Sequence, residues 1–331
     1  MKQKRGRWQF RPLMPIVFVF TFFVQPTPGL AMGTGACWGT VALETFIPGL
    51  GYAVSSQYGK GLLFGGGRWI TGRKYYQAIA RDDYQQNNSD IYVTTDAKNS
   101  PSGKTETDIY LNSSTYEAQF YGTLESDLWL VSLGDLYRSR CEPDNETYGL
   151  AFAPVRFDHF ITNWRFWLPI GALAVSAASY GDTNISRYHL GTGLTESRIK
   201  RDAWQQFYMV GFGEEMFFRG VVQQSFYNNL NQELGFGSEA SRHLSVWSSA
   251  AVFGLAHNGQ GFSANSAYAF AMGAYLGYAY MPEPGEQDLI TVIAIHAWWD
   301  IAVTYTILNN SSFTSSDSEV EVPLLAFGTR F

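Results

Sequence analysis

No Lys, Arg, Asp or Glu occurs between Arg242 and Glu283, and this absence constrains the chain more than any other feature. The polar segment 257–263 divides the run into two apolar parts. Such parts predict two membrane-spanning helices joined by a turn. Gly273 and Gly277 lie four residues apart in the second part, a small-xxx-small spacing that lets helices approach closely in lipid.

Further apolar segments flank this run. Trp164–Tyr180 begins with aromatic residues, as spanning helices do at the membrane interface, and Ile290–Leu308 contains only one formal charge, Asp300. An aromatic helix is expected between them, over Trp204–Tyr227. Together these segments predict an all-α fold, a polytopic membrane helical bundle, and an integral, multi-pass membrane protein.

The composition excludes several other classes of protein. Charged residues are only 16% and aromatic residues 16% of the 331 residues, which argues against disorder. The mean hydropathy of −0.13 is too low for a chain made only of spanning helices, so polar and apolar parts must be segregated. A net charge of −6 gives no basic surface for nucleic acid, so membrane lipid and a peptide are the expected partners.

The N-terminus has the three-part form of a secretory signal. The basic segment Met1–Arg11 is followed by the apolar run Leu13–Val24 and then by the small residues Gly29 and Ala31. Residues 1–31 are therefore predicted to be a signal peptide or an uncleaved signal anchor. This form is bacterial in type, which places the protein in the cell envelope, with the inner membrane as the expected site.

The middle of the chain alternates between apolar and polar character. Gly33–Ile70 is expected to form two short hydrophobic helices, and Ala80–Asn112 is polar. Tyr116–Arg140 suits an amphipathic helix on a membrane, on a partner helix or in a soluble core.

The two cysteines, Cys37 and Cys141, form no metal-ligand pattern and could make one disulfide outside the cytoplasm. The expected regions are the signal segment 1–31, a Gly-rich hydrophobic hairpin plus polar insert of unknown role 32–160, a membrane domain 161–310 and a polar C-terminal tail 311–331.

The first ionisable group inside the apolar half is the sequence Glu214-Glu215, followed by Arg219. Glu215 and Arg219 are four residues apart, so they share a helix face and can pair. Glu214 is rotated by about 100° from Glu215 and keeps a carboxyl that the arginine need not neutralise. A carboxyl in an apolar, partly desolvated site suits a general base that takes a proton from water. The alternative is an ion cluster that only ties helices together.

Two histidine elements complete the set. His257 ends an apolar helix four residues after Phe253, and His296 lies four residues before Asp300, so that the aspartate can orient the imidazole. Taken alone, either histidine could be a hydrogen-bonded core residue. Ionisable groups cost about 2.5–3.5 kcal/mol each inside a membrane helix. Their occurrence on successive apolar helices therefore predicts one converging polar site.

These residues resemble the signature of the CPBP family, the CAAX-prenyl-protease and bacteriocin-processing, Abi-like intramembrane endopeptidases. The family's EExxxR, FxxxH and HxxxN motifs read here as Glu214-Glu215 to Arg219, Phe253 to His257 and His296 to Asp300. The resemblance covers roughly residues 164–308, which makes 161–310 a CPBP-like intramembrane protease domain.

The resemblance implies a membrane-embedded hydrolase that carries out intramembrane proteolysis. By position, Glu214 would be the general base, His257 would help to position the water, and His296 with Asp300 would stabilise the oxyanion. Glu215 and Arg219 would support the site. No cofactor is implied.

Asp300 departs from the family pattern, in which many members have Asn. An ionised aspartate cannot donate a hydrogen bond to an oxyanion, so we expect Asp300 to orient His296. A metallopeptidase is the alternative, in which Glu214, His257 and His296 would hold zinc. No HExxH motif occurs, and Arg219 beside the carboxylates disfavours a dication, so a glutamic-type peptidase is preferred.

Two further hypotheses are open, one that replaces catalysis and one that concerns the N-terminal half beside a protease-like half. A silent scaffold or immunity-type membrane protein would keep the fold and bind a partner, although the presence of all three motifs favours an enzyme. The N-terminal half could also be an independent, envelope-associated module. The substrate is not encoded in any motif, and a bacterial signal favours bacteriocin-like or other peptide processing over prenylated tails.

Overall fold

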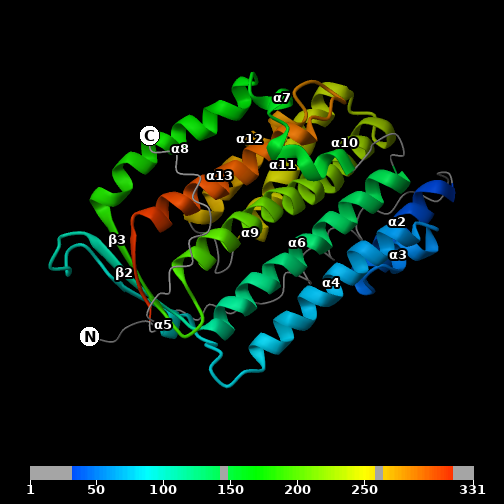
Figure 1. Ribbon diagram of the computed structural model, residues 1–331. Coiled ribbons are helices and arrows are strands. Elements are labelled where there is room, and N and C mark those ends of the chain that lie inside the picture. Colours follow the sequence, from blue (N-terminus) through cyan, green and yellow to red (C-terminus); the bar gives the residue numbers. More distant parts are fainter. Residues whose placement is uncertain (1–31, 142–147, 258–263, 316–331) are drawn as a thin grey trace, which may run out of the picture.

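The chain folds into a bundle of long helices with a small β-sheet at one end, as the computed structural model shows (Figure 1). The structure describes residues 32–141, 148–257 and 264–315, so the predicted signal segment and the tail from residue 316 on lie outside the described residues. The elements are α2 (Met32–Phe46), α3 (Leu50–Val54), α4 (Tyr58–Ile79), α5 (Asn88–Ile91), β1 (Tyr92–Thr95), β2 (Thr105–Leu111), α6 (Ser113–Cys141), η1 (Tyr148–Val155), α7 (Phe157–Phe160), α8 (Trp164–Thr183), β3 (Asn184–Leu190), α9 (Glu196–Phe217), η2 (Phe218–Gln223), α10 (Gln224–Asn228), η3 (Asn229–Glu233), α11 (Ser238–Ala256), α12 (Ala264–Tyr280), α13 (Leu289–Asn309) and β4 (Ser311–Ser315).

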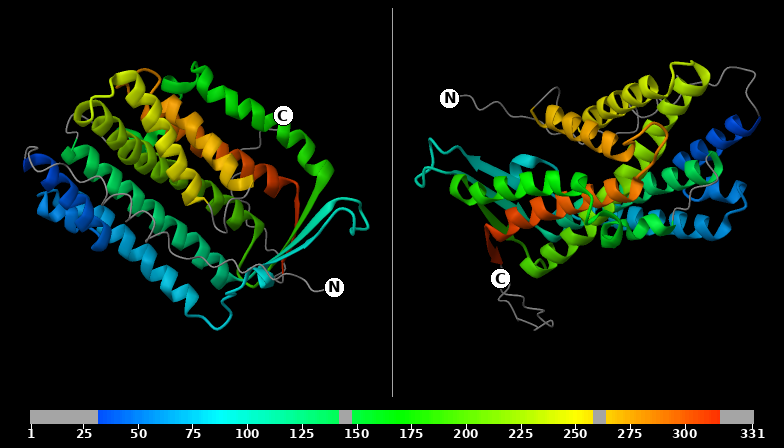
Figure 2. Two further views of the ribbon diagram at one scale, coloured as in Figure 1. Left: turned by 180° about the vertical axis from the view of Figure 1, so that it is seen from behind. Right: turned by 90° about the horizontal axis from the view of Figure 1, so that it is seen from above.

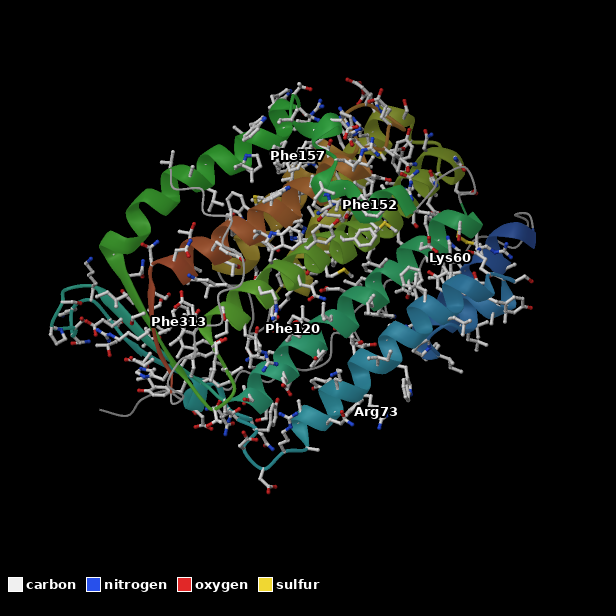
Figure 3. All side chains as sticks on the ribbon, viewed as in Figure 1. Lys60, Arg73, Phe120, Phe152, Phe157 and Phe313 are labelled. Atoms are coloured by element: carbon white, nitrogen blue, oxygen red, sulfur yellow. A yellow bond between two sulfur atoms is a disulfide. The ribbon has the colours of Figure 1, made fainter. Side chains whose placement is uncertain are left out.

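The long helices run alternately toward the sheet and away from it. Helices α4, α8 and α13 end near the sheet, whereas α6 and α9 begin there. Helices α2 and α3 lie at the opposite end of the bundle, and all views agree on this arrangement (Figures 1 and 2). Labelled side chains mark the two ends of the bundle. Phe313 and Phe120 lie toward the sheet, and Lys60 lies toward the other end (Figure 3).

The sheet has four strands in the order β1-β2-β3-β4. Strand β2 pairs antiparallel with β1 and parallel with β3, which in turn pairs parallel with β4. Ile109, Leu111 and Leu190 are buried with Ile199 of α9, which fixes the sheet to the bundle. The prediction of an all-α fold is thus correct for the bundle but omits this sheet. Its short strands lie in segments without long apolar runs.

Helix α9 passes through the middle of the bundle at very close range to its neighbours. A Cβ atom on Gly211 would lie 2.5 Å from the backbone nitrogen of Ala297 in α13. A Cβ on Gly213 would lie 2.9 Å from the carbonyl oxygen of Asp127 in α6. Glycine is therefore required at both crossings, since any side chain would push these helices apart. The crossings fix the turn of α9 that carries the two glutamates.

The N-terminal half is fastened to the rest at several points. Cys37 of α2 and Cys141 of α6 form a disulfide, with Cα atoms 5.5 Å apart. Lys60 Nζ of α4 lies 2.8 Å from the buried carboxylate of Asp135 in α6. Helix α6 in turn packs against α9, and the two helices share hydrophobic clusters with α13. The two halves of the chain therefore share one hydrophobic core.

Of the helices that the structure describes, α13 alone is long and apolar enough to cross a membrane by length and composition. Its mean hydropathy over the most apolar window is 1.4, and 44% of that window is buried within the bundle. The predicted spanning helix before residue 257 is α11, which is rich in serine, and the one after it is α12, which has only 17 residues. Among the described helices, length and apolar composition thus mark α13 as one candidate span, and they do not mark the other predicted spans.

Candidate active site

The last turn of α9 presents two adjacent glutamates in different directions. Glu215 is fully buried, and its Oε2 accepts a hydrogen bond from Nε of Arg219 at 2.9 Å. Glu214 points elsewhere and makes no ion pair with the arginine, as the helical rotation between adjacent residues requires. A π-helical segment, η2, begins directly afterwards at Phe218 and contains Arg219. Such π segments occur frequently at functional sites.

His296 of α13 is held by Glu215. Its Nδ1 lies 2.8 Å from Glu215 Oε1, and since a carboxylate accepts, Nδ1 is the protonated donor in this pair. The imidazole ring is buried, with its Nε2 directed toward Glu214. Glu215 therefore fixes both the tautomer and the orientation of His296.

His257, at the C-terminal end of α11, is likewise held through its Nδ1, here by a backbone carbonyl of the same helix. Its Nδ1 lies 2.8 Å from the carbonyl oxygen of Phe253, so Nδ1 again donates and Nε2 keeps a free lone pair. The histidine side chain is 38% exposed, against 18% for Glu214 and 10% for His296. Access to the site is therefore greatest on the His257 side.

The two histidine Nε2 atoms converge on one oxygen of Glu214. Oε2 of Glu214 lies 3.6 Å from Nε2 of His257 and 3.8 Å from Nε2 of His296. Both distances exceed a hydrogen bond, and this Oε2 is buried without any hydrogen-bond partner. Polar atoms separated in this way are typically bridged by water. The geometry therefore suits a water molecule bound among Glu214, His257 and His296.

Asp300 lies beside the other ring nitrogen of His296, Nε2. Its Oδ2 lies 3.4 Å from Nε2 of His296, one helical turn earlier in α13. Glu215 thus holds the imidazole at Nδ1, and Asp300 faces the same ring at Nε2, where it adds negative charge. The contact follows from helix geometry, because residues four positions apart are neighbours on one face.

The aromatic residue four positions before His257, Phe253, packs beside the charged groups of the site. Its ring centroid lies 4.3 Å from that of His257, 6.0 Å from that of His296 and 5.4 Å from the guanidinium of Arg219. The buried ring therefore packs near the arginine and both imidazoles.

Two polar residues at the site were not among the candidates from the sequence. Ser249 of α11 accepts a hydrogen bond from Nη1 of Arg219 at 3.2 Å and donates one to the carbonyl of Phe218 at 2.9 Å. Asp127 of α6 is buried beside Gly213, and Glu214, His296 and Asp300 are the charged groups that act on it. Ser249 lies one turn before Phe253, a spacing that could have suggested it, whereas Asp127 lies far from any motif.

No group of three or more His, Cys, Asp or Glu side chains in the described ranges is arranged to hold a metal ion. The three atoms that a zinc ion would need, Glu214 Oε2 and the Nε2 atoms of His257 and His296, do face one another. Arg219 is nearby on the Glu215 side, where it neutralises the second carboxylate. These three donor atoms are of the types that bind zinc. Their side chains are not, however, grouped in the arrangement that a metal site requires.

Comparison with known families finds a match in the second half of the chain. Residues 203–302 match the family model described as type II CAAX prenyl endopeptidase, Rce1-like. The match begins within α9, ends within α13 and contains every residue proposed from the sequence for the site. It confirms the resemblance drawn from the three motifs. No curated protein and no solved structure gives a significant match to the chain.

Proposed function

We propose that this protein is an intramembrane endopeptidase that hydrolyses peptide bonds of a membrane-associated peptide or protein with a water molecule activated by Glu214 and histidine. The family match supports a membrane protease. The observation that carries the proposal is the buried Oε2 of Glu214, which has no partner and faces two histidine nitrogens whose other nitrogens are already occupied.

The first half of the reaction is addition of water. Glu214 accepts a proton as the water oxygen forms a bond to the carbonyl carbon, and His257, whose Nε2 lies 3.6 Å from the same glutamate oxygen, helps to position the water. The electron pair of the carbonyl π bond moves to oxygen. His296, fixed by Glu215, is placed to donate from Nε2 to that oxyanion when it is protonated.

The second half is departure of the amine. The carbon–nitrogen bond breaks, the carbonyl re-forms, and the proton held by Glu214 passes to the leaving nitrogen. Glu214 thereby returns to its starting state, and no covalent enzyme intermediate is required. Arg219 contributes indirectly, because it neutralises Glu215 and leaves that carboxylate free to hold His296.

Membrane embedding of more than α13 is part of the proposal. Helices α4, α8 and α11 carry large apolar side chains that are exposed in the isolated bundle and so are available to lipid. These side chains are Leu62, Leu63, Trp69, Ile70, Trp164, Leu168, Val175, Leu244 and Trp247. Arg73 lies over Trp69 and Arg165 over Trp164, at 5.5 and 5.4 Å from the ring centroids. Such aromatic and basic pairs are typical of the membrane–water interface.

The proposal is tested by comparing new peptide N-termini in membranes that contain wild-type protein or the Glu214→Gln variant at equal abundance. Glu286→Gln, the same change at an exposed glutamate, is the matched control. We expect a set of N-termini with wild type and Glu286→Gln that is missing with Glu214→Gln. Identical sets from all three, with each protein stably inserted, would instead favour the scaffold reading. Stoichiometric zinc that is lost in Glu214→Ala would favour the metallopeptidase.

A further inference from the structure

Asp127 is a buried carboxylic acid to which the mechanism above assigns no task. It lies in α6, outside the matched segment, and only 3% of the residue is exposed. Its Oδ2 is buried without a hydrogen-bond partner, and the structure gives it no ion pair with a described residue. An unpaired buried carboxyl costs several kcal/mol in the charged state, so its presence needs a physical reason.

The position of Asp127 supplies that reason. Its backbone contacts Gly213, so closely that a Cβ on Gly213 would lie 3.1 Å from the Cα of Asp127. The next residue along α9 is Glu214, and Glu214 is the charged group that acts most strongly on Asp127, followed by His296 and Asp300. Asp127 therefore lies beside Glu214 across Gly213, and it interacts electrostatically with the same groups of α13, His296 and Asp300.

Oδ2 of Asp127 and Oε2 of Glu214 are both buried without a hydrogen-bond partner, and the residue next to Glu214, Gly213, contacts Asp127. Neighbouring unsatisfied polar atoms in a folded protein are most often satisfied by an ordered water molecule, which can make about two to four hydrogen bonds. A water that donates one O–H to each carboxylate keeps its oxygen lone pairs directed away from both. This is the orientation that attack on a carbonyl carbon requires.

We propose that Asp127 completes the site from the N-terminal half of the chain, and that its carboxyl and that of Glu214 together hold the attacking water. The inference rests on the proposed peptidase and adds a second carboxyl to it. The proton still passes to Glu214 and then to the leaving nitrogen, so Asp127 ends each cycle unchanged. The N-terminal half thereby gains a direct part in the site.

A substrate-free test is a map of the wild-type protein in lipid nanodiscs at a resolution that shows ordered water. We expect a water within hydrogen-bond distance of both Glu214 Oε2 and Asp127 Oδ2, and its absence in Asp127→Leu. A map without water there overturns the proposal whatever the protein cleaves. A bridging water in a protein that cleaves nothing would leave the proposal standing and refute the peptidase.

An activity test uses Asp127→Asn on a peptide cleaved by the wild type. The matched control is Asp135→Asn, about two turns along the same helix and equally buried, which loses only the ion pair with Lys60. We expect Asp127→Asn to lower kcat by roughly a hundredfold or more with little change in KM, because misplaced water costs about that much. Its melting temperature should stay level or rise, whereas Asp135→Asn should melt lower and keep kcat. Normal kcat with a lowered melting temperature in Asp127→Asn would show a structural role and overturn the proposal.

Discussion

At the scale of single residues, the site depends on two adjacent glutamates with different tasks. Glu215 is enclosed by Arg219 and by Nδ1 of His296, so its lone pairs are used and it serves as a support. Glu214 keeps an oxygen free toward the two histidine Nε2 atoms. The difference comes from helix geometry, since one residue of rotation turns the side chain by about 100°.

This division of tasks predicts opposite results for two isosteric variants. Glu215→Gln should lower kcat by about 10² or more, because the amide cannot balance Arg219 and holds His296 less firmly. Asp300→Asn should keep most of the activity, since Glu215 continues to orient the ring. Rates of cleavage of one peptide by both variants decide the matter, and a strong loss in Asp300→Asn alone would assign the orienting role to Asp300.

The site could be predicted from the sequence to the extent that its residues fall at helical spacings in apolar segments. The pairs Glu215 and Arg219, and His296 and Asp300, are found one turn apart, as the spacing indicates. Asp127 could not be predicted in this way, because its place in the site arises from a close crossing of two helices that are distant in sequence. The spacing of residues along one helix contains no information about where a distant helix crosses it.

At the scale of elements, α9 is the helix on which the site is built. It begins at Glu196, eight residues before the expected start at Trp204, because Thr195 caps it by accepting a hydrogen bond from the amide of Arg198. The strands were missed for a different reason. Strands β1 and β2 are short, partly exposed and lie within the polar segment 80–112, where alternation of apolar residues is too brief to separate a strand from a loop.

The close crossing of α9 and α13 predicts a sensitive glycine. Gly211→Ala should destabilise the protein by about 1–3 kcal/mol and shift Glu214 from His296, since the added methyl would overlap the backbone of Ala297. Gly171→Ala in α8 meets no atom within 4 Å and is the matched control, which should be neutral or stabilising. Thermal unfolding of both variants in the same detergent tests this, and equal melting temperatures would contradict the crossing.

The sheet carries a carboxylate whose titration is open to measurement. Hydrogen bonds from Ser102, Ser100 and Arg187 lower the pKa of Glu106 from 4.5 to about 2. A lowered pKa in the folded state adds stability above pH 4.5, and this stability is lost as the pH falls through about 2. Hydrogen exchange of β2 and β3 should therefore speed up over this range in wild type. In Glu106→Gln the acid dependence should be weaker, and an unchanged dependence would refute the assignment.

At the scale of the whole molecule, the segment that matches a protease family does not stand alone. Helix α6, which lies outside the match, packs directly on α9 and contributes Val131 and Leu136 to the buried clusters. The disulfide between Cys37 and Cys141 joins two positions that are 104 apart in the sequence, and so closes this N-terminal part into a loop. The reading of the N-terminal half as an independent module therefore has little support in the packing.

The disulfide predicts a specific pattern of stability. Cys37→Ser and Cys141→Ser should each lower the unfolding free energy by about 2–5 kcal/mol, and the double variant should be no less stable than either single one. A mobility shift on reduction should occur in wild type only. Free thiols in the wild-type protein from its native membrane would contradict the pairing and the oxidising compartment that it implies.

The most direct test of the central claim uses purified protein in lipid nanodiscs, incubated with a mixture of membrane-derived peptides and followed by mass spectrometry. The account predicts that wild type and Glu286→Gln produce the same new termini without added metal, and that Glu214→Gln produces none at equal folding and insertion. Cleavage of the same bonds by Glu214→Gln at the wild-type rate would contradict the assignment of the general base. The absence of cleavage by all three proteins would contradict the peptidase itself.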